Sequence, residues 1–164
     1  MQTEVAFLTT RVKAPYEDYW VKLKRVVKYI KVSLGFKTYV RSDSLSVIKL
    51  WLDASFSTYN ECRGHTGGMI SLVAGSITSG PWKQRINERI STANNLIGVN
   101  YLMGPVLWKL YFIQDKGYIV ERNIIFQDNH GTIHLMLNGN KSSLNSIKHV
   151  NVRYFFVKDV INRG

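Results

Sequence analysis

The sequence predicts an α/β fold: a mixed β-sheet of three antiparallel strands and then parallel strands, with flanking helices and an N-terminal helical prefix. Short apolar runs separated by turn residues fill the segment from Val47 to Lys83, which is typical of strands. Helical spacing of apolar residues begins at Ser91 and returns after one further short strand. The order of strands, helix, strand, helix and helix therefore indicates a mixed sheet.

Length and composition limit the domain organisation. A chain of 164 residues can bury one good core but not two full domains. Hydrophobic residues make up 45% and charged residues 20%, which is ordinary for a globular protein. We therefore expect a single domain over residues 43–164, preceded by a helical prefix over residues 1–42.

The prefix contains a predicted amphipathic helix from Trp20 to Val32. Pro15, followed by Glu17 and Asp18, suits its start, and Gly35 suits its end. Its polar side is entirely basic, with Lys22, Lys24, Arg25, Lys28 and Lys31. Such a side is either a solvated face or a surface for phosphates, and the lack of acids among these residues favours phosphates.

The remaining elements follow in chain order. The predicted strands are Val47 to Ala54, Thr66 to Val73, Ser76 to Lys83 and Asn123 to Phe126. The second and third form a hairpin around Ala74 and Gly75. The predicted helices begin at Ser91, at Thr132 (to Leu137) and at Val150 (to Ile161). Because proline lacks an amide hydrogen, Pro105 is expected to kink or split the first of them.

The charge balance indicates a polyanionic partner. Lys and Arg total 22 against 11 acids, a net charge of +11. Nucleic acid is favoured over a membrane, because the longest apolar stretch is interrupted by Asn100, Gly104 and Pro105. The N-terminus lacks the pattern of a signal peptide, and Cys62, as the only cysteine, cannot form an internal disulfide. We expect an intracellular protein, cytoplasmic or nuclear.

Two acids stand where predicted strands end. Asp53 follows the apolar run Val47 to Leu52, and Asp128 comes two residues after Phe126. Two carboxylates at one edge of a rigid sheet can bind a divalent metal. A turn or cap role is the alternative for either acid alone, and the pair in this order favours the metal.

Three segments, taken in order, resemble the ribonuclease H domain of copia-type retrotransposon polyproteins. They are Leu52-Asp53-Ala54-Ser55-Phe56, Gln127-Asp128-Asn129-His130-Gly131-Thr132-Ile133, and Ile147-Lys148-His149-Val150-Asn151-Val152-Arg153-Tyr154-Phe155-Phe156. The chain start, from Phe7 to Lys31, resembles the end of the preceding reverse transcriptase. The similarity is closest to copia-like elements of diatoms and related protists. It implies a ribonuclease-H-like fold over residues 43–164 and a remnant of the polymerase thumb or connection over residues 1–42.

The resemblance also implies roles for single residues. Asp53 and Asp128 correspond to metal-binding acids, whereas the metal-bridging Glu of the family corresponds to Asn95. Asp159 is the expected further acid, with Asn151 as the weaker alternative. His149 corresponds to a mobile histidine that moves a proton or helps product release, or else simply packs or caps. Any Mg²⁺ or Mn²⁺ would be bound weakly, by Asp53, Asp128 and Asp159.

The expected function is binding of an RNA/DNA hybrid or other nucleic acid with impaired cleavage. The expected contacts are Trp82, Lys83, Arg85, Asn129 and Arg153 in the domain, and Lys24, Arg25 and Lys28 in the prefix. A partly buried Trp82 flanked by solvated cations is an equal alternative. Two other functions stay open: an active hybrid-specific ribonuclease in which Asp53, Asp128 and Asp159 suffice, and an interaction module that binds the rest of a polyprotein or a host protein.

Overall fold

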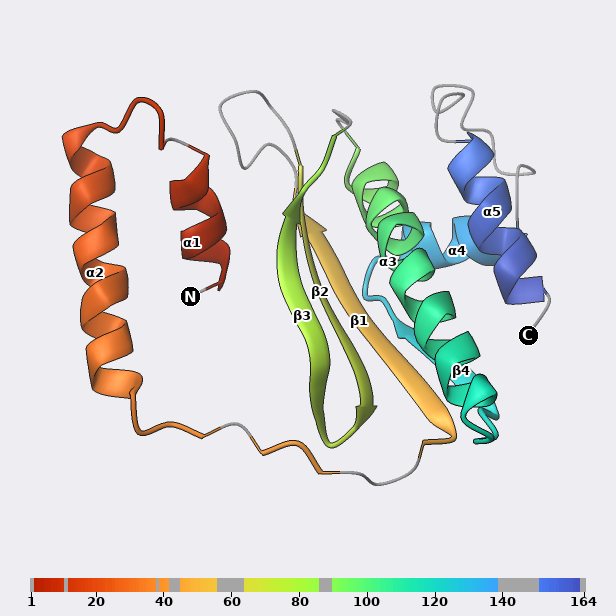
Figure 1. The fold of residues 1–164 in the computed structure, drawn as a ribbon. Coiled ribbons are helices and arrows are strands. Elements are labelled where there is room, and N and C mark those ends of the chain that lie inside the picture. The colour runs from red at the N-terminus through yellow and green to blue at the C-terminus, as the bar shows by residue number, and fades with distance from the viewer. Residues whose placement is uncertain are drawn as a thin grey trace. The chain divides into compact units, whose positions relative to one another are not determined.

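The structure is a computed structural model that describes residues 2–10, 12–37, 39–41, 45–55, 64–85, 90–138 and 151–162. It divides into two compact units, Met1–Tyr39 and Val40–Gly164. The first is helical, and the second contains the sheet with its helices (Figure 1). Each unit is described by itself.

The first unit is a pair of helices, α1 (Gln2–Thr9) and α2 (Glu17–Ser33). The ring of Phe7 stacks on Tyr19 with 5.6 Å between ring centroids, and the Lys22 ammonium lies 4.8 Å from the Phe7 centroid. Val26 alone is buried among the described residues of this unit. The predicted amphipathic helix is confirmed as α2, whereas α1 was not predicted.

The second unit is built on a four-stranded sheet in the order β3-β2-β1-β4. The strands are β1 (Val47–Ser55), β2 (His65–Val73), β3 (Gly75–Lys83) and β4 (Arg122–Phe126). β1 pairs antiparallel with β2, β2 pairs antiparallel with β3, and β4 joins β1 in parallel. The predicted mixed sheet and its hairpin are confirmed, although β4 is the only parallel addition within the described residues.

Three helices complete the unit: one packs on the sheet, and the other two pack on that helix (Figure 1). They are α3 (Ser91–Asp115), α4 (His130–Asn138) and α5 (Asn151–Asn162). The longest, α3, packs directly on β1 and β2 and contacts α4 and α5 with its other sides. Side chains of β1 alternate, so that Ile48, Leu50, Leu52 and Ala54 are buried toward α3. The core of the unit therefore lies between β1, β2 and α3.

Two glycines let α3 approach the sheet closely. A Cβ at Gly68 would stand 2.3 Å from Leu102 Cδ1, and one at Gly98 would stand 3.0 Å from Thr66 Cγ2. Real Cβ atoms do not reach 2.3 Å from another carbon, so any larger residue at Gly68 would force the Leu102 side chain to move. This close packing fixes the N-terminal turns of α3 against the ends of β1 and β2.

Of the two expected effects of Pro105, the split is wrong, since α3 continues unbroken to Asp115, and the kink stays a prediction. Proline removes the hydrogen bond to the carbonyl of Tyr101, four residues earlier. Both residues lie on the exposed side of the helix, where water can bond that carbonyl, while Val106 and Met103 hold the other side in the core. The helix is long and apolar enough to cross a membrane by length and composition, but 44% of its apolar window is buried inside the protein.

Candidate functional site

The side chains of Asp53 and Asp128 line one open groove of about 740 Å³. Asp53 lies near the end of β1 and Asp128 follows β4, and these strands are parallel neighbours. Parallel strands bring their carboxyl ends to the same edge of a sheet, which explains why residues 75 positions apart line the same groove. Both carboxylates are exposed to solvent.

The floor of the groove is the sheet face that turns away from α3. Trp51 and Phe126 are register partners on β1 and β4, and their rings stack with centroids 4.9 Å apart. Phe126 is 42% exposed. Opposite Asp53 on β2 stands Gly67, whose missing side chain leaves the backbone accessible. The groove thus combines two acids with an aromatic pair and open backbone.

Asn95 lies in the first turns of α3 and bonds to residues next to both acids. Its Oδ1 accepts hydrogen bonds from the Ala54 amide (3.2 Å) and from Gln127 Nε2 (3.1 Å). Its Nδ2 donates to the Ser91 carbonyl (3.2 Å), and the residue is 2% exposed. The two residues bonded to Oδ1 are the chain neighbours of Asp53 and Asp128. Asn95 therefore links the backbone next to Asp53 with the side chain next to Asp128.

The hydrogen bond from Ala54 to Asn95 stands where β1 extends beyond the end of its parallel neighbour β4. The pairing with β4 ends at Trp51 and Phe126, whereas β1 continues to Ser55. Beyond that point the Ala54 amide has no partner on β4, and a buried amide without a bond is costly. Asn95 Oδ1 supplies the missing acceptor.

A polar network continues from Asn95 into α4, and sequence reasoning missed it. Gln127 Oε1 accepts a hydrogen bond from the Asn129 amide at 2.9 Å. Asn129 Oδ1 accepts one from the Thr132 amide at 3.0 Å, which caps the start of α4. Asn129 Nδ2 donates to Ser91 Oγ, back on α3. The run Gln127-Asp128-Asn129 directly after a strand was the available signal, but Asp128 was interpreted as a metal ligand and Asn129 as a nucleic-acid contact, and the cap was not considered.

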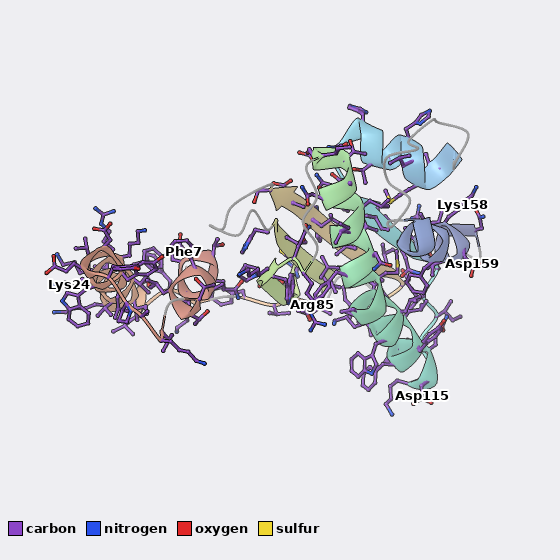
Figure 2. The ribbon with its side chains drawn as sticks, turned by 90° about the horizontal axis from the view of Figure 1, so that it is seen from above. Phe7, Lys24, Arg85, Asp115, Lys158 and Asp159 are labelled. Atoms are coloured by element: carbon purple, nitrogen blue, oxygen red, sulfur yellow. The ribbon has the colours of Figure 1, made fainter. Side chains whose placement is uncertain are left out.

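The expected further acid does not line the groove. Asp159 is exposed on α5 and is not among the residues that line the groove. In Figure 2 it lies beside Lys158, on the far side of α3 from Arg85. His149 falls outside the described residues, and only the helical backbone is described for Asn151 and Arg153. The structure brings Asp53, Asp128 and Asn95 together, but not Asp159.

These residues do not fit a pair of metal ions. An amide can ligate Mg²⁺ only through its oxygen, and both lone pairs of Asn95 Oδ1 already accept hydrogen bonds. Two carboxylates remain, which suit at most one ion held largely by water. Among the described residues no three His, Cys, Asp or Glu side chains gather as a possible metal site.

A second groove, of about 280 Å³, lies where β3 leaves the sheet beside α3. Trp82, Lys83 and Arg85 line it together with Asn100 and Tyr101. Trp82 is partly buried, and Gln84 between the cations is buried and donates to Thr66 Oγ1 at 2.8 Å. Three of the predicted nucleic-acid contacts thus share one concave surface.

The other predicted contacts are placed differently. Lys24, Arg25 and Lys28 are exposed on α2 in the first unit, where the Lys24 ammonium lies 5.5 Å from the Trp20 centroid. Asn129 is partly buried, and its side chain is occupied by the cap of α4 and the link to α3.

Comparison of the chain with family models, with curated proteins and with solved structures found no match.

Proposed function

We propose that this chain is a ribonuclease-H-like domain of a copia-type retrotransposon polyprotein that binds an RNA/DNA hybrid or other nucleic acid and has impaired cleavage. The observation that carries the proposal is the groove with Asp53 and Asp128, backed by a buried amide at Asn95 instead of a third acid. The order of the strands, with three antiparallel and the fourth parallel to the first, is the order that this family implies.

Binding to nucleic acid is supported by charge. The chain carries a net charge of +11, and cations line the groove beside β3. Lys and Arg that neutralise phosphates release counterions, which supplies affinity without base contacts. A hybrid offers regularly spaced phosphates on both strands, so a basic surface suits it.

Impaired cleavage is supported by the chemistry of the site. Ribonuclease H enzymes use two metal ions roughly 4 Å apart to activate water and stabilise the leaving oxygen. That pair needs several anionic ligands, and the described lining of the groove presents two. The neutral Asn95 adds no charge, and its oxygen is engaged with Ala54 and Gln127.

A cleavage assay on a labelled RNA/DNA hybrid, with Mg²⁺ or Mn²⁺, tests the proposal. We expect the protein to bind the hybrid at low salt and to cleave it no faster than the Asp53→Asn variant. Robust turnover that Asp53→Asn abolishes would instead support an active ribonuclease. Absence of hybrid binding even at low salt would support an interaction module.

The Asn95→Glu variant gives the converse test. A carboxylate at this position would add a third acid next to Ala54 and Gln127, the chain neighbours of Asp53 and Asp128, and with it the negative charge that a metal pair needs. We expect metal-dependent cleavage to rise at least tenfold over the parent protein, provided that circular dichroism shows a folded chain. The double variant Asn95→Glu, Asp53→Asn is the control and should lose that gain.

A further inference from the structure

Three large aromatic side chains form an exposed stripe along α3. Tyr101 is 50% exposed, Trp108 63% and Phe112 49%. At about 100° per residue they lie within roughly 40° of one another around the helix axis, and they extend along roughly 16 Å of it. The rings of Trp108 and Phe112 stack, with 5.3 Å between centroids. We call these three residues the aromatic stripe.

The aromatic stripe continues into the groove beside β3. The Tyr101 ring lies 6.2 Å from the Trp82 ring, at a tilt of 48°. Trp82 and Tyr101 both line that groove, together with Lys83 and Arg85. A single surface therefore leads from the end of β3 to the C-terminal turns of α3.

Cations accompany the rings. The Lys109 ammonium lies 5.8 Å from the Trp108 centroid and the Lys116 ammonium 5.5 Å from the Phe112 centroid. Partial burial lowers the pKa of Lys109, so a neighbouring anion would favour its charged form. Asp115 is the one acid in this part of α3, and its contact with Lys116, at 3.3 Å, is solvent-exposed. Such an exposed ion pair contributes little free energy to the fold, so Lys116 remains available to a phosphate.

The chemistry of this surface favours a strand of nucleotides over a lipid surface. Interfacial membrane helices bury a broad apolar face that includes aliphatic side chains. The aliphatic residues of α3 are instead packed in the core, among them Leu96, Val99, Leu102 and Val106. Rings with cations beside them are the arrangement with which proteins hold unpaired bases and their phosphates.

We propose that single-stranded nucleic acid binds along the aromatic stripe and the groove beside β3, with bases stacked on the rings and phosphates on the flanking cations. This surface does not use Asp53 or Asp128, which lie on the groove at the other face of the sheet. The proposal extends the nucleic-acid binding of the proposed function, with which it shares the cations of the groove beside β3, but it does not depend on the two acids.

The test is the fluorescence anisotropy of a labelled oligothymidylate with the full chain at low salt. In the double variant Trp108→Ala, Phe112→Ala, we expect affinity to fall at least roughly 25-fold, because each lost base stack weakens binding about fivefold or more. Tyr111→Ala is the matched control: Tyr111 is also 63% exposed, but it lies outside the stripe. It should change affinity less than twofold. Circular dichroism checks that each variant is folded.

Two results would overturn the proposal. The first is a double variant, folded by circular dichroism, that binds the oligothymidylate as the parent does or no worse than Tyr111→Ala. The second is loss of binding to phosphatidylserine vesicles in the double variant with unchanged oligothymidylate affinity, which would assign the stripe to a membrane surface. The variant Asp53→Asn should keep full affinity for the single strand, which separates this test from that of the hybrid site.

Discussion

An amide at position 95 makes contacts that a carboxylate could not make together. Asn95 Nδ2 donates to the Ser91 carbonyl while Oδ1 accepts from the Ala54 amide and Gln127. A carboxylate has no proton to give the carbonyl, and burying it at 2% exposure would be costly without a compensating cation. An amide can therefore link the end of β1 to Gln127, directly after β4, without a metal.

The structural role of this residue predicts a loss of stability in Asn95→Ala. The substitution removes three hydrogen bonds and leaves the buried Ala54 amide without an acceptor. We expect the free energy of unfolding to fall by about 2 to 4 kcal/mol. Urea denaturation followed by circular dichroism measures it. Gln114→Ala, at an exposed position of the same helix, is the control and should stay within about 0.5 kcal/mol of the parent.

At the scale of elements, the segment between β4 and α4 depends on one cap. Asn129 stands directly before α4, and its Oδ1 accepts the hydrogen bond of the Thr132 amide. The same side chain reaches Ser91 and Thr92 at the start of α3. Asn129 thereby fixes how the chain leaves Asp128, which gives it a structural role whether or not it contacts nucleic acid.

This cap predicts a difference between two substitutions at one position. Asn129→Ala removes the acceptor, and we expect the free energy of unfolding to fall by about 1 to 2 kcal/mol. Asn129→Asp keeps an acceptor and adds a negative charge at the helix N-terminus, so it should cost much less. Thermal unfolding of both variants beside the parent checks this. Equal losses would mean that the link to Ser91, and not the cap, carries the stability.

At the scale of the whole molecule, the order of the strands and most helices could be predicted, because each element has its own pattern of apolar residues. The period of two in β1 and the helical spacing in α2 and α3 lie within short windows. Contacts between residues far apart in the chain could not be predicted in this way. That Asn95 would bond Ala54 and Gln127 depends on how far β1 outruns β4, which no short window contains. The missed helix α1 has a weak pattern, and its contacts within the first unit are with α2.

The groove with Asp53 and Asp128 also has features that the sequence could predict and features that it could not. Asp53 and Asp128 could be paired from the sequence because the ends of parallel neighbouring strands meet. The Trp51 and Phe126 stack required the register, and the aromatic stripe required knowledge of which side of α3 the core covers. Asp159 was assigned by resemblance alone, and the structure leaves it on α5 and away from the groove lining.

The charge of the whole chain predicts how hybrid binding responds to salt. If binding rests on phosphate contacts, the logarithm of the affinity falls linearly with the logarithm of salt concentration, by about 0.9 for each neutralised phosphate. Removing a contacting cation should therefore reduce the slope by about that amount. The exposed cations Lys24, Arg25 and Lys28 on α2 form one set, and Lys83 and Arg85 at the β3 groove form another.

We expect the triple variant Lys24→Ala, Arg25→Ala, Lys28→Ala to lower the slope by up to about 3 and the double variant Lys83→Ala, Arg85→Ala by up to about 2. Lys158→Ala, on α5, is the control and should leave the slope unchanged. Anisotropy titrations of a labelled hybrid at several salt concentrations give each slope. A slope identical in all four proteins would show that neither set contacts phosphates, because counterion release depends on the number of cations engaged and not on the total charge of the protein.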